Sequence, residues 1–146
     1  MYMKLQQLFE YNPSQENWAN AMDAMDVVHS ILGDLVWDND SDEEPKPGFY
    51  VVSRSWIGYP IFADMDLPPG EGGAIGLNSL YGTSAFDVTT AAHESFHALL
   101  HSQGKNFHDE IAVNNLTRAW IQQNIKDTRF LRACMHILNN SDRSYS

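Results

Sequence analysis

The feature that most restricts this chain is a helical segment, residues 87–103, that contains the sequence His-Glu-Ser-Phe-His. Gly104 follows it directly, and a glycine at this place is a natural helix stop. Because an α-helix has 3.6 residues per turn, His93 and His97 lie one turn apart on the same face. Their ring nitrogens can then meet at one zinc ion with tetrahedral geometry. The spacing therefore predicts that this helix supplies two ligands of a zinc site.

Glu94 lies next to His93 in the sequence and so points to the side of the histidine pair. From there its carboxylate can reach a zinc-bound water. The metal lowers the pKa of such a water, and a nearby carboxylate can take the proton as general base. The pattern therefore assigns Glu94 a catalytic role and assigns the two histidines the role of ligands.

The third ligand has to come from outside this pair. His101 continues the same helical face, but it lies about 6 Å beyond His97 along the helix axis. We therefore expect His101 to line the pocket or to contact one of the metal-binding side chains, and not to bind the metal itself. Glu110 opens the next helix, and a helical hairpin can fold it back onto the metal. Glu110 is the expected third ligand, with His108, Asp109 and His101 as the alternatives.

Asn114 is expected beside the ligands. It lies four residues after Glu110, on the same face of that helix. Its amide oxygen can accept a hydrogen bond from the imidazole of a ligand, and partners of this kind orient metal-bound histidines. The sequence therefore predicts that Asn114 positions a ligand and does not itself touch the metal.

The rest of the chain predicts an α+β fold in which residues 1–146 form a single domain. Apolar residues recur at helical spacing in some segments, and β-forming residues dominate others. The further expected elements are a helix at 14–35, strands within 49–65 and at 74–78, and helices at about 109–124 and 128–139. A helix, then strands, then helices is the order of a compact α+β domain with a small sheet.

Charge argues against a nucleic-acid ligand. The formal net charge is -10, and an acidic surface repels phosphate backbones. Much of this charge lies in an acidic loop at residues 38–48, which we interpret as a solvated surface loop. A calcium-binding loop is excluded there, because Glu43 stands where a glycine is needed and Phe49 where a glutamate is needed.

The cellular location is expected to be cytoplasmic. The first residues lack the apolar core of a signal peptide, and no stretch has the length and apolar character to cross a membrane. Cys134 is the only cysteine, so an internal disulfide is impossible, which fits a reducing compartment. No membrane partner is expected, and the sequence leaves the oligomeric state open.

At these residues the chain resembles the zincin metallopeptidases with a glutamate third ligand, and more narrowly the ImmA/IrrE-type family. That family has a strand ending in Asn and a His-Glu-x-x-His helix followed by Leu-Leu-His, which residues 75–78 and 91–101 match. The family pattern continues with a glutamate, a small residue, Asn or Asp, and an apolar residue, matched here by Glu110, Val113, Asn114 and Leu116. The resemblance covers about residues 74–120. The chain departs from the family in three ways: the loop before Glu110 is short, Val113 stands where Ala is usual, and Thr117 stands where a small apolar residue is common.

The resemblance implies a compact zincin-like domain that uses Zn²⁺ to hydrolyse a peptide bond in a protein substrate. It also implies a regulatory role, often connected with phages or mobile elements. Substrate is expected to add an extra strand along Ala74, Ile75, Gly76, Leu77 and Asn78. The candidates for a side chain that stabilises the oxyanion are Tyr81, His101 and His108.

An alternative interpretation needs no catalysis. A small acidic protein can bind the nucleic-acid site of another protein by imitating the charge of DNA. In that case the metal would hold the fold together, and the acidic loop would make the contacts. The two interpretations differ in Glu94, because a pure binding or inhibitor protein does not need that carboxylate.

Overall fold

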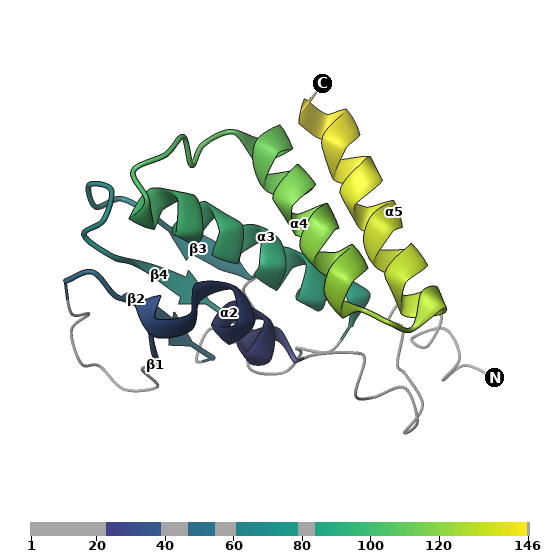
Figure 1. Cartoon of the computed structure of the whole chain (residues 1–146), viewed down its shortest axis with the longest axis horizontal. Helices are drawn as coiled ribbons and strands as arrows, with labels where there is room; N and C mark the ends of the chain where they lie inside the picture. Colours follow the sequence, from purple (N-terminus) through teal and green to yellow (C-terminus); the bar gives the residue numbers. More distant parts are fainter. Residues whose placement is uncertain (1–22, 39–46, 55–60, 79–83, 146) are drawn as a thin grey trace.

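The computed structural model describes residues 23–38, 47–54, 61–78 and 84–145, and these form an α+β arrangement, as the sequence predicts (Figure 1). The helices of this part are α2 (Ala24–Leu32), the 3-10 turn η2 (Gly33–Leu35), α3 (Ala85–Ser102), α4 (Glu110–Asn124) and α5 (Thr128–Tyr145). The strands are β1 (Val36–Asp38), β2 (Tyr50–Ser53), β3 (Phe62–Asp64) and β4 (Gly73–Gly76).

The strands form a small mixed sheet in the order β1-β2-β4-β3. β1, β2 and β4 run parallel, whereas β3 pairs with β4 in the antiparallel direction. Ile75 of β4 lies opposite Val52 of β2 on one side and opposite Ala63 of β3 on the other. β4 is therefore an inner strand, and β3 is an edge strand of the sheet in the described part of the chain.

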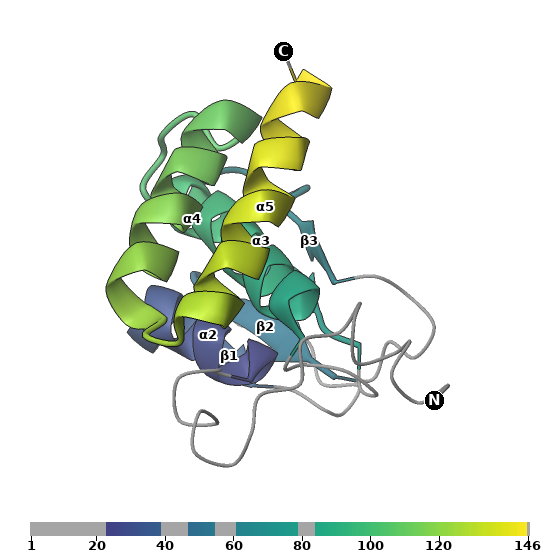
Figure 2. The same ribbon diagram turned by 90° about the vertical axis from the view of Figure 1, so that its right-hand side faces the viewer.

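α3 is the central helix of the molecule. It contacts α2, α4 and α5 as well as β3 and β4. Figure 2 shows α4 and α5 side by side with α3 behind them. The core between these elements is apolar, and its largest fully buried apolar side chains include Tyr50, Ile75, Leu77, Ile121 and Phe130. Burial of this apolar surface is the main force that fixes α3 in place.

Local sequence sets the ends of α3. The Ser84 hydroxyl accepts a hydrogen bond from the Asp87 backbone N–H at 3.1 Å, so the helix begins two residues earlier than the sequence analysis placed it. At the other end, Gly104 has φ +69° and donates its N–H to the His101 carbonyl. A side chain at positive φ is strained, which is why a glycine ends the helix here.

The predicted helix at 14–35 is only partly correct. Residues 14–22 lie outside the described residues, and α2 ends at Leu32, where Gly33 takes φ +54°. The chain then forms β1, which the sequence analysis missed because a strand of three residues is too short to show a period. The rest of the acidic loop, residues 39–46, and the expected strand residues 56–59 also lie outside the described part.

The last helix is longer than predicted. α5 continues to Tyr145, whereas the sequence analysis ended it at about residue 139. Its final turns are polar, so the apolar period fades, but contacts with α4 hold them. Asn114 donates hydrogen bonds to Ser141 and Asp142, and Arg118 forms an ion pair with Asp142 at 2.6 Å. None of the helices described here is both long enough and apolar enough to pass through a bilayer.

Candidate metal centre

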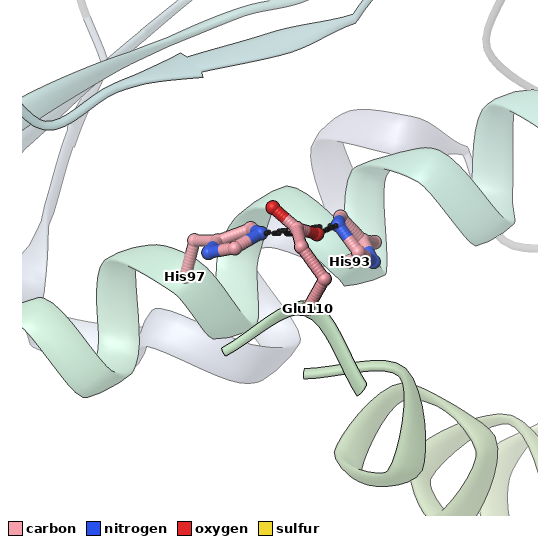
Figure 3. A group of neighbouring side chains, drawn as sticks. All are labelled: His93, His97 and Glu110. Atoms are coloured by element: carbon pink, nitrogen blue, oxygen red, sulfur yellow. Dashed lines mark hydrogen bonds and ion pairs between the residues drawn. The ribbon is translucent and has the colours of Figure 1, made fainter. Parts of the chain in front are cut away.

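Three side chains meet between α3 and the first turn of α4 (Figure 3). The Nε2 atoms of His93 and His97 lie 3.0 Å apart. Glu110 Oε2 lies 2.9 Å from the first nitrogen and 3.1 Å from the second. The structure therefore brings together the two histidines of the motif and the glutamate that the sequence analysis expected beside them.

Hydrogen bonds on the far side of each ring fix its tautomer. His93 Nδ1 lies 2.7 Å from the Asn114 side-chain oxygen, and His97 Nδ1 lies 2.5 Å from the Phe107 carbonyl oxygen. Since these oxygens only accept, each Nδ1 must carry the proton and donate it. In a neutral ring the lone pair then lies on Nε2, so two nitrogen lone pairs point at the Glu110 carboxylate.

This arrangement places acceptor atoms against one another. Three acceptors about 3 Å apart repel unless a proton or a cation lies among them. Burial lowers the pKa of His93, and the neighbouring His97 acts in the same direction, which favours the neutral ring. Two neutral imidazoles and one carboxylate can hold a divalent metal ion, which would turn this repulsion into attraction.

Asn114 is itself held in one orientation. Its amide group donates to the Ser141 hydroxyl at 3.2 Å and to the Asp142 carboxylate at 2.9 Å, so its oxygen must face His93. Hydrogen bonds from Asn114 and Arg118 lower the pKa of Asp142, which keeps this carboxylate ionised. The tautomer of His93 thus depends on contacts that reach from α4 to the last turns of α5.

Glu94 lies beside the cluster without belonging to it. Burial raises the pKa of Glu94 to about 7, whereas the nearby His97 and a hydrogen bond from the Ala63 backbone lower it. The Glu110 carboxylate adds to the upward shift. A cation bound at the cluster would favour the ionised form of Glu94, because an opposite charge stabilises a carboxylate. The charge of Glu94 is therefore tied to whether a cation occupies the cluster.

A hollow of about 240 Å³ opens next to the cluster. Its walls include Ala63 of β3, His108 from the loop before α4, and the side chains of Glu94, His97 and Glu110. A ligand can therefore approach the cluster from the side of the edge strand.

The other candidates for the third ligand lie elsewhere. His101 is fully buried, accepts a hydrogen bond from the Tyr50 hydroxyl at 2.6 Å and donates one to the Leu67 carbonyl at 2.7 Å. Asp109 caps α4 by accepting a hydrogen bond from the Ala112 N–H. His108 lines the hollow, and its ring contacts the ring of Phe107 at a tilt. Of the four candidates, Glu110 alone belongs to the three-residue cluster.

The expected substrate strand needs correction. Ala74, Ile75 and Gly76 pair with β2 on one side and with β3 on the other, so no edge is left there for an added strand. The Leu77 N–H donates to the Ser53 carbonyl at 2.7 Å, and Asn78 follows in the same run. The order of strands in a sheet cannot be read from the sequence of one short strand. Tyr81, a candidate for the oxyanion, lies outside the described residues.

Three contributors to the site escaped the sequence analysis. The Phe107 carbonyl holds His97, and a backbone carbonyl has no sequence signature. Ala63 touches Glu94 from a strand about thirty residues earlier in the chain. Tyr145 lies near the cluster at the end of α5, where burial raises its pKa and the charge of Glu110 acts in the same direction. The polar contacts of that final turn depend on the packing of α5 against α4.

Comparison of the chain with protein-family models, with curated proteins and with solved structures found no match.

Proposed function

We propose that this protein is a zinc-dependent metallopeptidase with His93, His97 and Glu110 as ligands and Glu94 as general base. The observation that carries the proposal is the convergence of three acceptor atoms, two of them on histidines whose tautomers are fixed from behind, with a half-buried carboxyl group beside them. A protein that needed only packing at this place would gain more from apolar side chains.

The donor set suits zinc. Catalytic zinc sites use three nitrogen or oxygen ligands and leave one position open. Ligands at the usual zinc distances and tetrahedral angles lie about 3.3 Å from one another, so the three atoms here need to spread by only a few tenths of an ångström. The hollow beside the cluster leaves space for the open position.

Bound zinc would supply a water of lowered pKa and polarise the scissile carbonyl. Glu94 would take the proton of the attacking water and later pass it to the leaving amine. Its partial burial and its hydrogen bond from Ala63 keep the carboxyl group at one place beside the ligands. The edge strand β3 would align the substrate backbone, since it borders the hollow and is antiparallel to its neighbour.

Together, the ligand helix, the glutamate from the next helix and an antiparallel edge strand support the zincin-like interpretation. The proposed reaction is hydrolysis of a peptide bond in a protein substrate, with a regulatory role suggested by the family resemblance alone.

The test compares the zinc-loaded protein with its Glu94→Gln variant on a peptide library made from a digested proteome. We expect Glu94→Gln to keep about one zinc per chain and to lose about 10²–10⁴-fold in cleavage rate, because only the proton acceptor is removed. Glu71→Gln, at an exposed loop position, is the matched control and should cleave normally. Equal cleavage by the folded, zinc-loaded Glu94→Gln variant would reject the proposal.

A further inference from the structure

A second, larger hollow also borders Glu94. It has a volume of about 500 Å³ and lies between α3 and the second half of α5. His93 and Glu94 form part of its wall, and Glu94 also lines the smaller hollow at the edge strand. One carboxyl group therefore belongs to the walls of both depressions, and a chain bound past it would have one hollow lined by α5 and another lined by β3 within reach of its side chains.

The larger hollow has an apolar character. Phe86 from α3 and Ile137, Leu138 and Tyr145 from α5 contribute most of its hydrophobic lining. Phe86 and Tyr145 are large yet 56% and 48% exposed, so apolar surface is available at this place. The remaining polar contributors are neutral hydroxyl and amide groups, apart from His93 and Glu94. An anionic side chain entering this hollow would lose water without gaining an opposite charge, because no lysine or arginine belongs to its described lining, and the one carboxyl group there, Glu94, is assigned to the reaction at the metal.

The smaller hollow differs in chemistry. Asp66 and Glu110 line it together with Glu94, and no lysine or arginine does so among the described residues. Ala63, Met65 and Phe107 also line it, but the three carboxyl groups leave the smaller hollow less apolar than the larger one. The two hollows would therefore accept different side chains, and the larger one is the place where an apolar group can be buried.

We propose that the larger hollow is the specificity pocket for one large apolar side chain, such as that of leucine, methionine or phenylalanine, adjacent to the scissile bond. This inference rests on the proposed peptidase function, because it assumes that the substrate backbone passes Glu94 at the metal. Its volume lies within the range of pockets that bind small molecules, so a side chain as large as phenylalanine fits.

The test measures binding and needs no knowledge of the natural substrate. Hydroxamates bind zinc through one end and carry a side chain at the other. We compare acetohydroxamate, 3-phenylpropanohydroxamate and succinic monohydroxamate by calorimetry on the zinc-loaded full chain. The phenyl compound should bind about 10-fold tighter than acetohydroxamate, or more, because its ring is buried. The carboxylate compound should bind no tighter than acetohydroxamate.

A charge placed in the pocket should reverse this order. Ile137→Arg puts a cation into the wall, so the phenyl compound should lose about 10-fold and the carboxylate compound should gain. Leu116→Arg, at an exposed position of α4 outside both hollows, is the matched control and should change neither affinity. Phe86→Arg, at a more exposed position of the same wall, gives the same test if Ile137→Arg does not fold.

The outcomes separate the two proposals. Equal affinity for the three hydroxamates, no binding of any of them, or an order that Ile137→Arg and Phe86→Arg both leave unchanged overturns the pocket assignment. If the phenyl compound binds most tightly but no cleavage depends on Glu94, the peptidase function is rejected and the apolar ligand class of the pocket stands. Cleavage that depends on Glu94 but shows no large apolar residue beside the cut rejects the pocket and leaves the peptidase function standing.

Discussion

The three histidines of α3 stand at the same spacing and lie in two different environments. His93 and His97 turn their Nε2 atoms toward Glu110 of α4, and their rings are 14% and 11% exposed. His101, one further turn along, is fully buried between the Tyr50 hydroxyl and the Leu67 carbonyl. The first two rings turn the lone pair of Nε2 toward the Glu110 carboxylate, whereas both nitrogens of the third form hydrogen bonds inside the protein.

The difference follows from what packs over each turn of the helix. The first turn of α4 covers His93 and His97 and brings a carboxylate, while β2 and the loop after β3 cover His101. The ring of His101 also contacts the ring of Phe107, whose carbonyl holds His97. His101 therefore supports the cluster from behind, and its buried hydrogen bonds serve stability.

The largest expected effect comes from removing the rings that face Glu110. His93→Ala or His97→Ala should weaken zinc binding by more than about 100-fold. Loss of a residue that only orients a ligand costs up to about that much, and loss of the ligand itself should cost more. Zinc per chain after dialysis, measured by atomic spectroscopy, checks this. His101→Ala is the comparison variant and should retain zinc wherever it folds. Full zinc content in both His93→Ala and His97→Ala would show that these two rings, like His101, do not bind the metal.

The next largest effect is expected at Glu110, because its carboxylate contacts His93 and His97 but not His101. Glu110→Gln keeps the size of the side chain and removes its charge, so zinc affinity should fall by about 100-fold or more. This loss is larger than the one expected when a residue that only orients a ligand is changed. Competition with a chelator of known affinity measures the change. Asp109→Asn, at the neighbouring helix cap, should leave zinc affinity nearly unchanged. Loss of zinc in Asp109→Asn alone would exchange the roles of these two acids.

Asn114 tests whether a residue that holds a ligand, without touching the metal itself, affects zinc binding. Asn114→Ala removes the acceptor that fixes the tautomer of His93, so zinc affinity should fall by about 10–100-fold. Asn115→Ala, at an exposed position next in sequence, is the matched control and should keep full affinity. An equal effect of the two changes would show that the hydrogen bond to His93 does not matter for the metal.

The smallest effect is expected at the buried end of the helix. Tyr50→Phe removes the donor to His101 Nδ1 and leaves a buried acceptor without its partner, which should cost about 1–3 kcal/mol in the free energy of unfolding. Urea denaturation of the metal-free protein measures this cost. Zinc affinity should stay within a factor of a few, and a loss as large as that of Asn114→Ala would place His101 among the groups that hold the metal.

The sequence by itself determined the features that depend on neighbours along the chain. The spacing of His93 and His97 places them on one helical face, and Gly104 ends that helix whatever surrounds it. Glu110 and Asn114 share a face of α4 for the same reason. The α+β arrangement and all three C-terminal helices were also predictable, because caps and apolar periods are local signals.

The tertiary structure decided which of these groups meet. In the sheet that the described residues form, β4 is an inner strand and β3 lies at the edge, so the expected substrate strand was wrong, although a strand does lie at about that place in the sequence. The Phe107 carbonyl became the partner of His97, and the packing of α5 on α4 fixed Asn114. A sequence records the residue types, but the partner of each polar group depends on contacts between segments far apart in the chain, and the burial of apolar surface selects those contacts.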